Sequence, residues 1–268
     1  MCGRYTVTAT PEVLRALFGY PEQPNFPPRF NIAPTQPIAI VRLMDGKRQF
    51  ALVRWGLLPS WVKNPKSFAP LINARGETAA EKPAFRAAMK RRRCLIPADG
   101  FYEWKATGGP RKQPYFIRAK AGGPFAFAGL WETWTGPNGE ELETAAIVTT
   151  SANRLLRPIH DRMPVIVAPG GFDLWLNNAD VDPVTASALI APAPENLLEA
   201  FPVSTDVNRV ANDNPKLVER AEEIAEAAPA PKPARPKSAR PKSASPKPAA
   251  KHAPAKRAKK ANGQGSLF

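Results

Sequence analysis

The chain has 268 residues, 43% of them hydrophobic and 23% charged, a composition typical of a globular protein that buries a sizeable core. It contains no run of 18 apolar residues, and its first residues show no basic segment followed by an apolar one, so we expect neither a membrane span nor a secretory signal. The net charge is +15, and residues 230–268 hold 11 of the 38 basic residues and none of the 23 acidic ones.

The first third of the chain alternates short regular elements with Pro-rich segments. A helix is expected over 11–19, because Thr10 can cap it and a proline suits its first turn. Residues 20–37 are rich in proline and are expected to be irregular. Asp45-Gly46 predicts a hairpin turn. The other expected elements here are strands at 38–43 and 50–55, a long loop at 56–80 and a basic helix at 82–92.

Strands dominate the remainder of the folded part. They are expected at 94–98, 101–105, 114–119, 125–133, 144–150 and 164–168, with helices at 171–178, 183–190, 194–200 and 217–228. The basic run at 90–93 is interpreted as a solvated helix face. Many strands with peripheral helices predict an α+β fold whose core is an antiparallel sheet or a closed barrel, in one domain over residues 1–228.

The composition changes abruptly after residue 228. Residues 234–248 form a near-repeat of the unit ARPKS and contain almost no apolar side chains. Such a segment cannot offset the entropy lost on ordering, so residues 229–268 are expected to be a disordered basic arm. Its Pro-spaced cations predict binding to DNA phosphates, with an affinity that falls steeply with salt.

Cys2 is the most informative residue for chemistry. If Met1 is removed, Cys2 carries an amine and a thiol on adjacent carbons, and this pair condenses with an aldehyde to an imine and then a thiazolidine ring. The start Met-Cys-Gly also suits a hydrolase that attacks amides with an N-terminal Cys. A third interpretation is a non-enzymatic DNA-binding protein in which Cys2 is incidental. Two distant cysteines and two histidines favour free thiols in a reducing cytoplasm, with no metal or cofactor.

Four further side chains suit catalysis or binding. His160 is suited to proton transfer at neutral pH. Glu103 stands between aromatic residues, and apolar surroundings raise the pKa of a carboxyl, which suits a general acid. Asn73 can orient an amine or polarise a carbonyl, and Arg75 can clamp a phosphate. Each of the four also has a purely structural interpretation, so the single residues do not decide between them.

Seven motifs occur in one order along the chain. They are MCGRYT at 1–6, RFNIAP at 29–34, RWGLLPSW at 54–61, LINARGET at 71–78, CLIPADGFYEWK at 94–105, IHDRMP at 159–164 and VNRVANDNP at 207–215. Together they resemble the SOS response-associated peptidase family, whose members process abasic sites in DNA. The resemblance spans roughly residues 2–220 and places the amidohydrolase interpretation second.

The resemblance implies a mechanism and a set of site residues. Cys2 matches the nucleophile that forms a thiazolidine crosslink to the ring-opened aldehyde of an abasic site in single-stranded DNA and so protects the site from strand cleavage. Asn73 matches the residue that positions the amine and the sugar, Glu103 the carboxyl that assists ring opening, and His160 the residue that assists imine formation. The family name implies self-removal of the residue before Cys2. The implied DNA contacts are Arg4, Asn31, Pro34, Trp61, Arg75, Trp104, Thr149 and Arg162.

The last five residues, 264–268, resemble the peptide by which bacterial DNA-repair proteins bind the replication sliding clamp. Gln264, Leu267 and Phe268 match its anchors, whereas Gly265 stands where Leu is usual. Apolar anchors on a flexible tether suit binding to a pocket. We therefore expect a monomer in the cytoplasm, associated with the nucleoid, with abasic single-stranded DNA and the clamp as partners.

Overall fold

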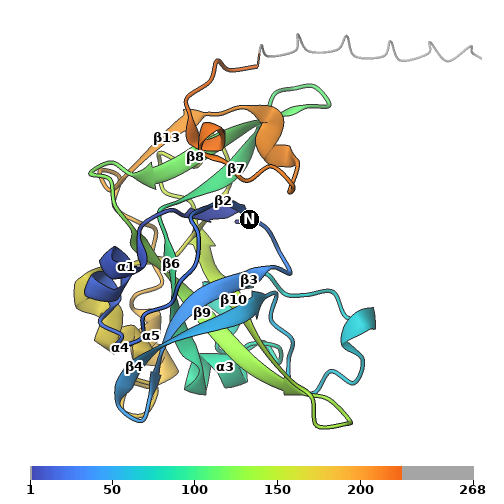
Figure 1. The fold of residues 1–268 in the computed structure, drawn as a ribbon, viewed down its shortest axis with the longest axis vertical. Helices are drawn as coiled ribbons and strands as arrows, with labels where there is room; N and C mark the ends of the chain where they lie inside the picture. The colour runs from blue at the N-terminus through green and yellow to red at the C-terminus, as the bar shows by residue number, and fades with distance from the viewer. Residues whose placement is uncertain (1, 225–268) are drawn as a thin grey trace, which may run out of the picture. The chain divides into compact units, whose positions relative to one another are not determined.

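Five long strands form a closed barrel (Figure 1). The computed structural model describes residues 2–224. The barrel strands are β3 (Pro37–Met44), β4 (Lys47–Trp55), β6 (Arg93–Ala98), β9 (Phe125–Thr135) and β10 (Glu141–Ser151). They pair in the order β10-β4-β3-β6-β9, and β9 pairs with β10 to close the ring. A ring with an odd number of strands cannot alternate in direction throughout, and here β4 and β10 form the parallel pair. The predicted α+β fold with a closed barrel is confirmed.

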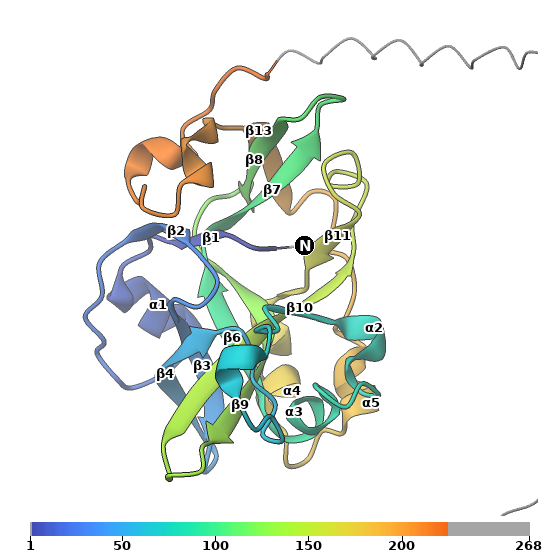
Figure 2. The same ribbon diagram turned by 90° about the vertical axis from the view of Figure 1, so that its right-hand side faces the viewer.

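A five-stranded antiparallel sheet lies at one end of the barrel (Figure 2). Its order is β13 (Leu198–Pro202), β8 (Lys112–Ala119), β7 (Gly100–Ala106), β1 (Tyr5–Val7) and β2 (Arg29–Ile32). Asp99 alone separates β6 of the barrel from β7 of the sheet, and its carboxylate accepts hydrogen bonds from the backbone of Thr8 and Ala9. Strand β1 pairs with β2 on one side and with β7 on the other. This pairing anchors the start of the described chain, and Cys2 is buried in the interior.

Short helices lie on the outside of the barrel strands (Figure 1). Helix α1 (Pro11–Phe18) has the predicted caps, since the Thr10 side chain accepts a hydrogen bond from the Val13 N–H and Gly19 ends the helix with φ +70°. The other short elements are α2 (Gly76–Ala79), α3 (Arg86–Arg91), α4 (Phe172–Leu176), α5 (Pro183–Ser187), β5 (Asn73–Arg75), β11 (Arg162–Pro164), β12 (Ile166–Val167) and 3-10 turns at Pro65–Ser67, Pro169–Gly171, Thr205–Asn208 and Pro215–Val218.

Four expectations about secondary structure are wrong. The long loop expected at 56–80 contains strand β5 and helix α2, because residues 73–75 pair in parallel with β10. Residues 194–200 are not a helix but lead into strand β13, where pairing with β8 and packing of Phe201 on Phe116 outweigh the local helical preference. The Pro-rich segment 20–37 contains strand β2, because residues 29–32 pair with β1. The expected helix at 217–228 is, as far as residue 224, the end of a 3-10 turn followed by extended chain.

The basic run at 90–93 is also not a solvated face throughout, because the Arg93 side chain is fully buried. Its Nη1 donates to the Met89 carbonyl at 2.9 Å, and its Nε donates to the Trp175 carbonyl at 2.7 Å. Its Nη2 donates to the carbonyls of Asn177 and Val181 at 2.9 and 2.8 Å. One guanidinium therefore satisfies four carbonyls where α3, β6 and α4 meet.

Replacing Arg93 with Met is expected to lower the free energy of unfolding by at least about 3 kcal/mol, because four carbonyls, in two buried and two part-buried hydrogen bonds, lose their donor together. Urea denaturation followed by circular dichroism measures the change. Arg91, two residues earlier and exposed, supplies the matched control in R91M, which is expected to shift the midpoint little. Equal effects of the two variants would contradict the assignment of Arg93 as the buried donor to these four carbonyls.

Candidate active site

Cys2 lies three residues before the start of β1 and is fully buried. Its Sγ makes a weak hydrogen bond of 3.8 Å to the Arg4 carbonyl. Burial raises the pKa of the thiol well above its ordinary range, and the negative charge of Glu103 raises it further. The sulfur is therefore a protonated thiol at neutral pH, and it needs a partner to take its proton before or during attack.

Asn73 contacts residue 2 directly. It is the first residue of β5, which pairs in parallel with β10, with Asn73 opposite Ile147. The side-chain Nδ2 donates to the Cys2 carbonyl at 2.8 Å. The Asn73 Oδ1 is buried and has no hydrogen-bond partner among residues 2–224. This oxygen can therefore accept a hydrogen bond beside Cys2. The predicted pairing of Cys2 with Asn73 thus has a geometric basis.

Glu103 is a buried carboxyl in the middle of β7, opposite Tyr115 of β8. Burial raises its pKa to about 7. At neutral pH a large fraction of this carboxyl is therefore protonated and able to donate a proton, which is the property expected of a general acid. The negative charge of Glu103 acts on the Cys2 thiol, so the two groups lie within range of an electrostatic interaction.

His160 lies in the turn before β11, and its ring is held by Nδ1. This nitrogen accepts a hydrogen bond from the Arg162 N–H at 3.0 Å and lies 2.9 Å from the Asp161 carboxylate. Burial lowers the pKa of the imidazole. A neutral ring that accepts at Nδ1 carries its proton on Nε2, whereas a protonated ring would pair with Asp161. The arrangement suits a group that exchanges one proton.

Arg4 and Asn31 form a network with the loop that follows β13. Arg4 Nη1 donates to Asn31 Oδ1 at 3.0 Å and to the Val207 carbonyl at 2.8 Å. Asn31 is fully buried, and its Nδ2 donates to the carbonyls of Val207, Arg209 and Asn212. The Asn31 amide is thus occupied by protein partners, and Asn31 supports the side chain of Arg4.

The predicted aromatic contacts lie in different surroundings. Trp104, on β7 beside Glu103, donates from its Nε1 to Asn208 Oδ1 at 2.8 Å. Trp61 is 58% exposed and packs edge-on against Phe68 in the segment between β4 and β5. Pro34 is half-buried just after β2. Trp61 therefore exposes more than half of its side chain, as a stacking surface requires.

Arg162, Thr149 and Arg75 meet across β11, β10 and β5. Thr149 lies opposite Arg75 in the β10–β5 pairing, and Arg162 Nη2 donates to the Thr149 carbonyl at 2.7 Å. The same nitrogen donates to Glu77 Oε2 at 2.8 Å. Sequence reasoning missed Glu77, although it stands in the LINARGET motif, because no spacing along the chain relates it to Arg162.

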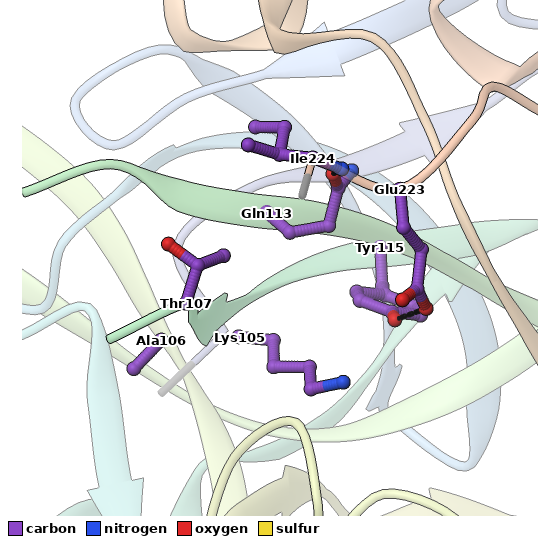
Figure 3. Close-up of a pocket in the computed structure, with 7 residues that line it drawn as sticks. All are labelled: Lys105, Ala106, Thr107, Gln113, Tyr115, Glu223 and Ile224. Carbon is purple, nitrogen blue, oxygen red and sulfur yellow. Dashed lines mark hydrogen bonds between the residues drawn. The ribbon is translucent and has the colours of Figure 1, made fainter. Parts of the chain in front are cut away.

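A separate pocket of about 140 Å³ lies beside the β7–β8 hairpin (Figure 3). The Tyr115 hydroxyl donates to the Glu223 carboxylate there, and Gln113 Oε1 accepts from the Ile224 N–H at 2.7 Å. Its lining residues are Lys105, Ala106, Thr107, Gln113, Tyr115, Glu223 and Ile224. None of these belongs to the predicted site, and their contacts hold the end of the described chain on the sheet.

Comparisons with known proteins point to one family. A model of the SOS response associated peptidase (SRAP) family matches residues 1–210. The chain is 40% identical over 222 residues to the abasic site processing protein YoqW of Bacillus subtilis, covering 82% of this chain and 99% of that protein. It is 34% identical over 227 residues to the abasic site processing protein YedK of Escherichia coli, with coverage of 82% and 99%.

The fold has similar solved structures. A protein from Bacteroides thetaiotaomicron, determined by X-ray crystallography, superposes with a TM-score of 0.73 at 27% identity, covering 82% of this chain and all of that one. A second, from Bordetella bronchiseptica, has a TM-score of 0.67 at 28% identity and covers 76% of this chain. Within residues 2–224, no helix has the length and apolarity that a membrane crossing requires.

Proposed function

The chain belongs to the SOS response-associated peptidase family, and from this premise we propose that it processes abasic sites in single-stranded DNA by covalent capture. The observation that carries the proposal is the contact of Asn73 with Cys2 in a site that also holds the carboxyl of Glu103, whose pKa burial raises to about 7. The names of the curated relatives, abasic site processing proteins, support the same substrate.

The proposed chemistry uses each group once. After removal of Met1, by self-cleavage or by an aminopeptidase, protonated Glu103 donates its proton to the ring oxygen of the abasic sugar. The bond between C1′ and that oxygen breaks, the C1′ hydroxyl loses its proton to water, and C1′ becomes the aldehyde carbon. The Cys2 amine attacks C1′ and water leaves, which forms an imine, with His160 moving the proton. The Cys2 sulfur then adds to the same carbon while its proton passes to the imine nitrogen, and the thiazolidine ring closes.

We assign the DNA path to side chains around this centre. Trp61 and Trp104 supply aromatic faces, and Arg4, Arg75 and Arg162 supply cations, the combination that binds single strands without sequence preference. The sequence also predicts contacts from Asn31, Pro34 and Thr149, of which Asn31 and Thr149 are fully buried. The proposal gives Asn31 an indirect part, as the residue that orients Arg4 from below.

The test is a denaturing gel. Untagged protein, with removal of Met1 established by mass, is mixed with single-stranded DNA carrying one abasic site and, in parallel, with intact DNA of the same sequence. A slow band that survives boiling in detergent, with the abasic DNA alone, is the expected result. Absence of the band together with hydrolysis of glutamine would instead favour the N-terminal Cys amidohydrolase, and DNA binding without a covalent product would favour a non-enzymatic binding protein.

The C-terminal arm lies outside the described residues, and its roles are proposed from sequence. We propose that residues 229–260 hold the enzyme on DNA in the nucleoid and that Gln264, Leu267 and Phe268 bind the sliding clamp, with the enzyme acting as a monomer. Both roles fit a tether that lets one active site search the single-stranded DNA around it.

Replacing residues 230–260 with a neutral Gly/Ser linker of equal length is expected to flatten the salt dependence of DNA binding. The segment holds 11 cations, and on single strands each phosphate that a cation neutralises adds about 0.7 to the steepness of log affinity against log salt. Fluorescence anisotropy at several salt concentrations measures the slope. Because the linker keeps residues 264–268 in place, an unchanged slope would remove the DNA-binding role of the arm alone.

A further inference from the structure

We propose that Glu77 is a positioning residue that orients the Arg162 guanidinium toward the DNA backbone. The inference rests on the proposed function, since it assumes that Arg162 meets a phosphate. It adds a residue that the motifs did not assign, located on α2, outside the strands that carry Arg162 and the catalytic groups.

The Arg162 side chain is fixed along one edge. Its Nη2 donates to Glu77 Oε2 at 2.8 Å and to the Thr149 carbonyl at 2.7 Å, and its Nε donates to Thr149 Oγ1 at 3.3 Å. The other carboxylate oxygen of Glu77 accepts from Thr150 Oγ1 at 3.4 Å. Glu77 is therefore itself oriented by Thr150 of β10. Of the two groups that accept from Arg162 Nη2, the Thr149 carbonyl belongs to β10 and the Glu77 carboxylate is bonded to that strand.

The opposite edge of the guanidinium stays available. Among the described residues, Arg162 Nη1 has no hydrogen-bond partner, while Nε and Nη2 are both engaged. A guanidinium is rigid and planar, so fixing one edge fixes the direction of the other. The free edge then presents its two N–H groups to a phosphate at little further cost in side-chain entropy.

The location of Arg162 gives this orientation a use. The Arg162 backbone N–H donates to His160 Nδ1, so the same residue holds the ring assigned to imine formation. On the other side of Thr149 lies Arg75, two residues after Asn73. A phosphate bound between Arg162 and Arg75 would flank the sugar that Asn73 and His160 act upon.

Glu77 is a poor candidate for a purely stabilising ion pair. Its side chain is 47% exposed against 15% for Arg162, so solvent screens the carboxylate and limits what the pair contributes to folding. A negative charge beside a cation that binds DNA also weakens the local attraction for phosphate. If charge alone mattered, loss of Glu77 would strengthen DNA binding, whereas positioning predicts the opposite.

The test compares two variants of nearly equal size, Glu77→Met and Glu77→Gln. Both remove the charge, but Gln keeps an oxygen that accepts from Arg162 and Met does not. Binding is measured by anisotropy with single-stranded DNA that carries a tetrahydrofuran site, an abasic analogue that cannot open. We expect E77M to bind this DNA about tenfold more weakly than E77Q does. At saturating concentrations of reactive abasic DNA, we expect E77M to crosslink as fast as E77Q, because the variant affects binding and not the chemical step.

The effect is expected to act through Arg162. In an Arg162→Ala background, the difference between Met and Gln at residue 77 is expected to vanish, which a double-mutant cycle measures. Equal affinities of E77M and E77Q, or a difference that persists without Arg162, would overturn the proposal. Crosslinking by the wild type is measured in the same series, so absence of the covalent product rejects the proposed function while the binding cycle still decides the role of Glu77.

Discussion

Replacing Cys2 with Ala is expected to abolish the stable covalent product while leaving DNA binding measurable. A thiazolidine needs both the amine and the sulfur of one residue, and Ala keeps the amine alone, so the reaction stops at an imine that water reverses. The denaturing gel with abasic DNA measures the loss, which we expect to be complete. Reduction with borohydride before denaturation is expected to trap the imine of C2A and restore a band.

Cys94→Ala is the matched control for this variant. Cys94 is likewise a buried free thiol, but it lies in barrel strand β6 among apolar side chains, and burial raises its pKa. C94A is expected to form the heat-stable band as the wild type does. A stable band from C2A without borohydride, or its loss from C94A, would contradict the assignment of Cys2 as the crosslinking residue.

Replacing Glu103 with Gln is expected to slow crosslinking by about 10²- to 10⁴-fold, the usual contribution of a positioned general acid. Gln keeps the size and polarity of the side chain but has no acidic proton. The pKa of about 7 also predicts that the wild-type rate falls as the pH rises above neutrality, because Glu103 then loses the proton it must donate. Single-turnover rates from about pH 5.5 to 8.5 measure both effects, and E103Q is expected to lack the alkaline decline.

The free energy of unfolding of E103Q shows whether its slower crosslinking comes from the lost proton donor or from misfolding. The pKa of Glu103 is about 7 in the folded protein against an ordinary 4.5, so between these values the folded state holds a proton that the unfolded state has released. The free energy of unfolding therefore falls as pH rises through this window, by roughly 3 kcal/mol in all. E103Q is expected to be more stable than the wild type above pH 7. An E103Q protein less stable than the wild type above pH 7, or a wild-type stability that does not fall between about pH 4.5 and 7, would contradict the buried-carboxyl assignment.

Local signals account for several features that the sequence predicted correctly. The caps of α1 at Thr10 and Gly19 are properties of neighbouring residues, and the Asp45-Gly46 turn takes positive φ at both positions, as a tight two-residue hairpin requires. The sequence alone also identifies the residue types that the chemistry needs, which are an N-terminal aminothiol, a carboxyl and an imidazole. These features depend on covalent neighbours and on side-chain chemistry, which the sequence alone determines.

Contacts between residues far apart in the chain determine the features that the sequence did not predict. Strands β2 and β13 exist because partners far along the chain bond to them, against a Pro-rich and a helix-like local pattern. Arg93 is buried because the carbonyls of a distant helix converge on it, while its neighbour Arg91 is exposed. Burial raises the pKa of Glu103, and the fold alone brings Glu77 to Arg162, 85 residues away. Burial and contact between distant residues are properties of the tertiary structure, because no local pattern encodes which segments meet.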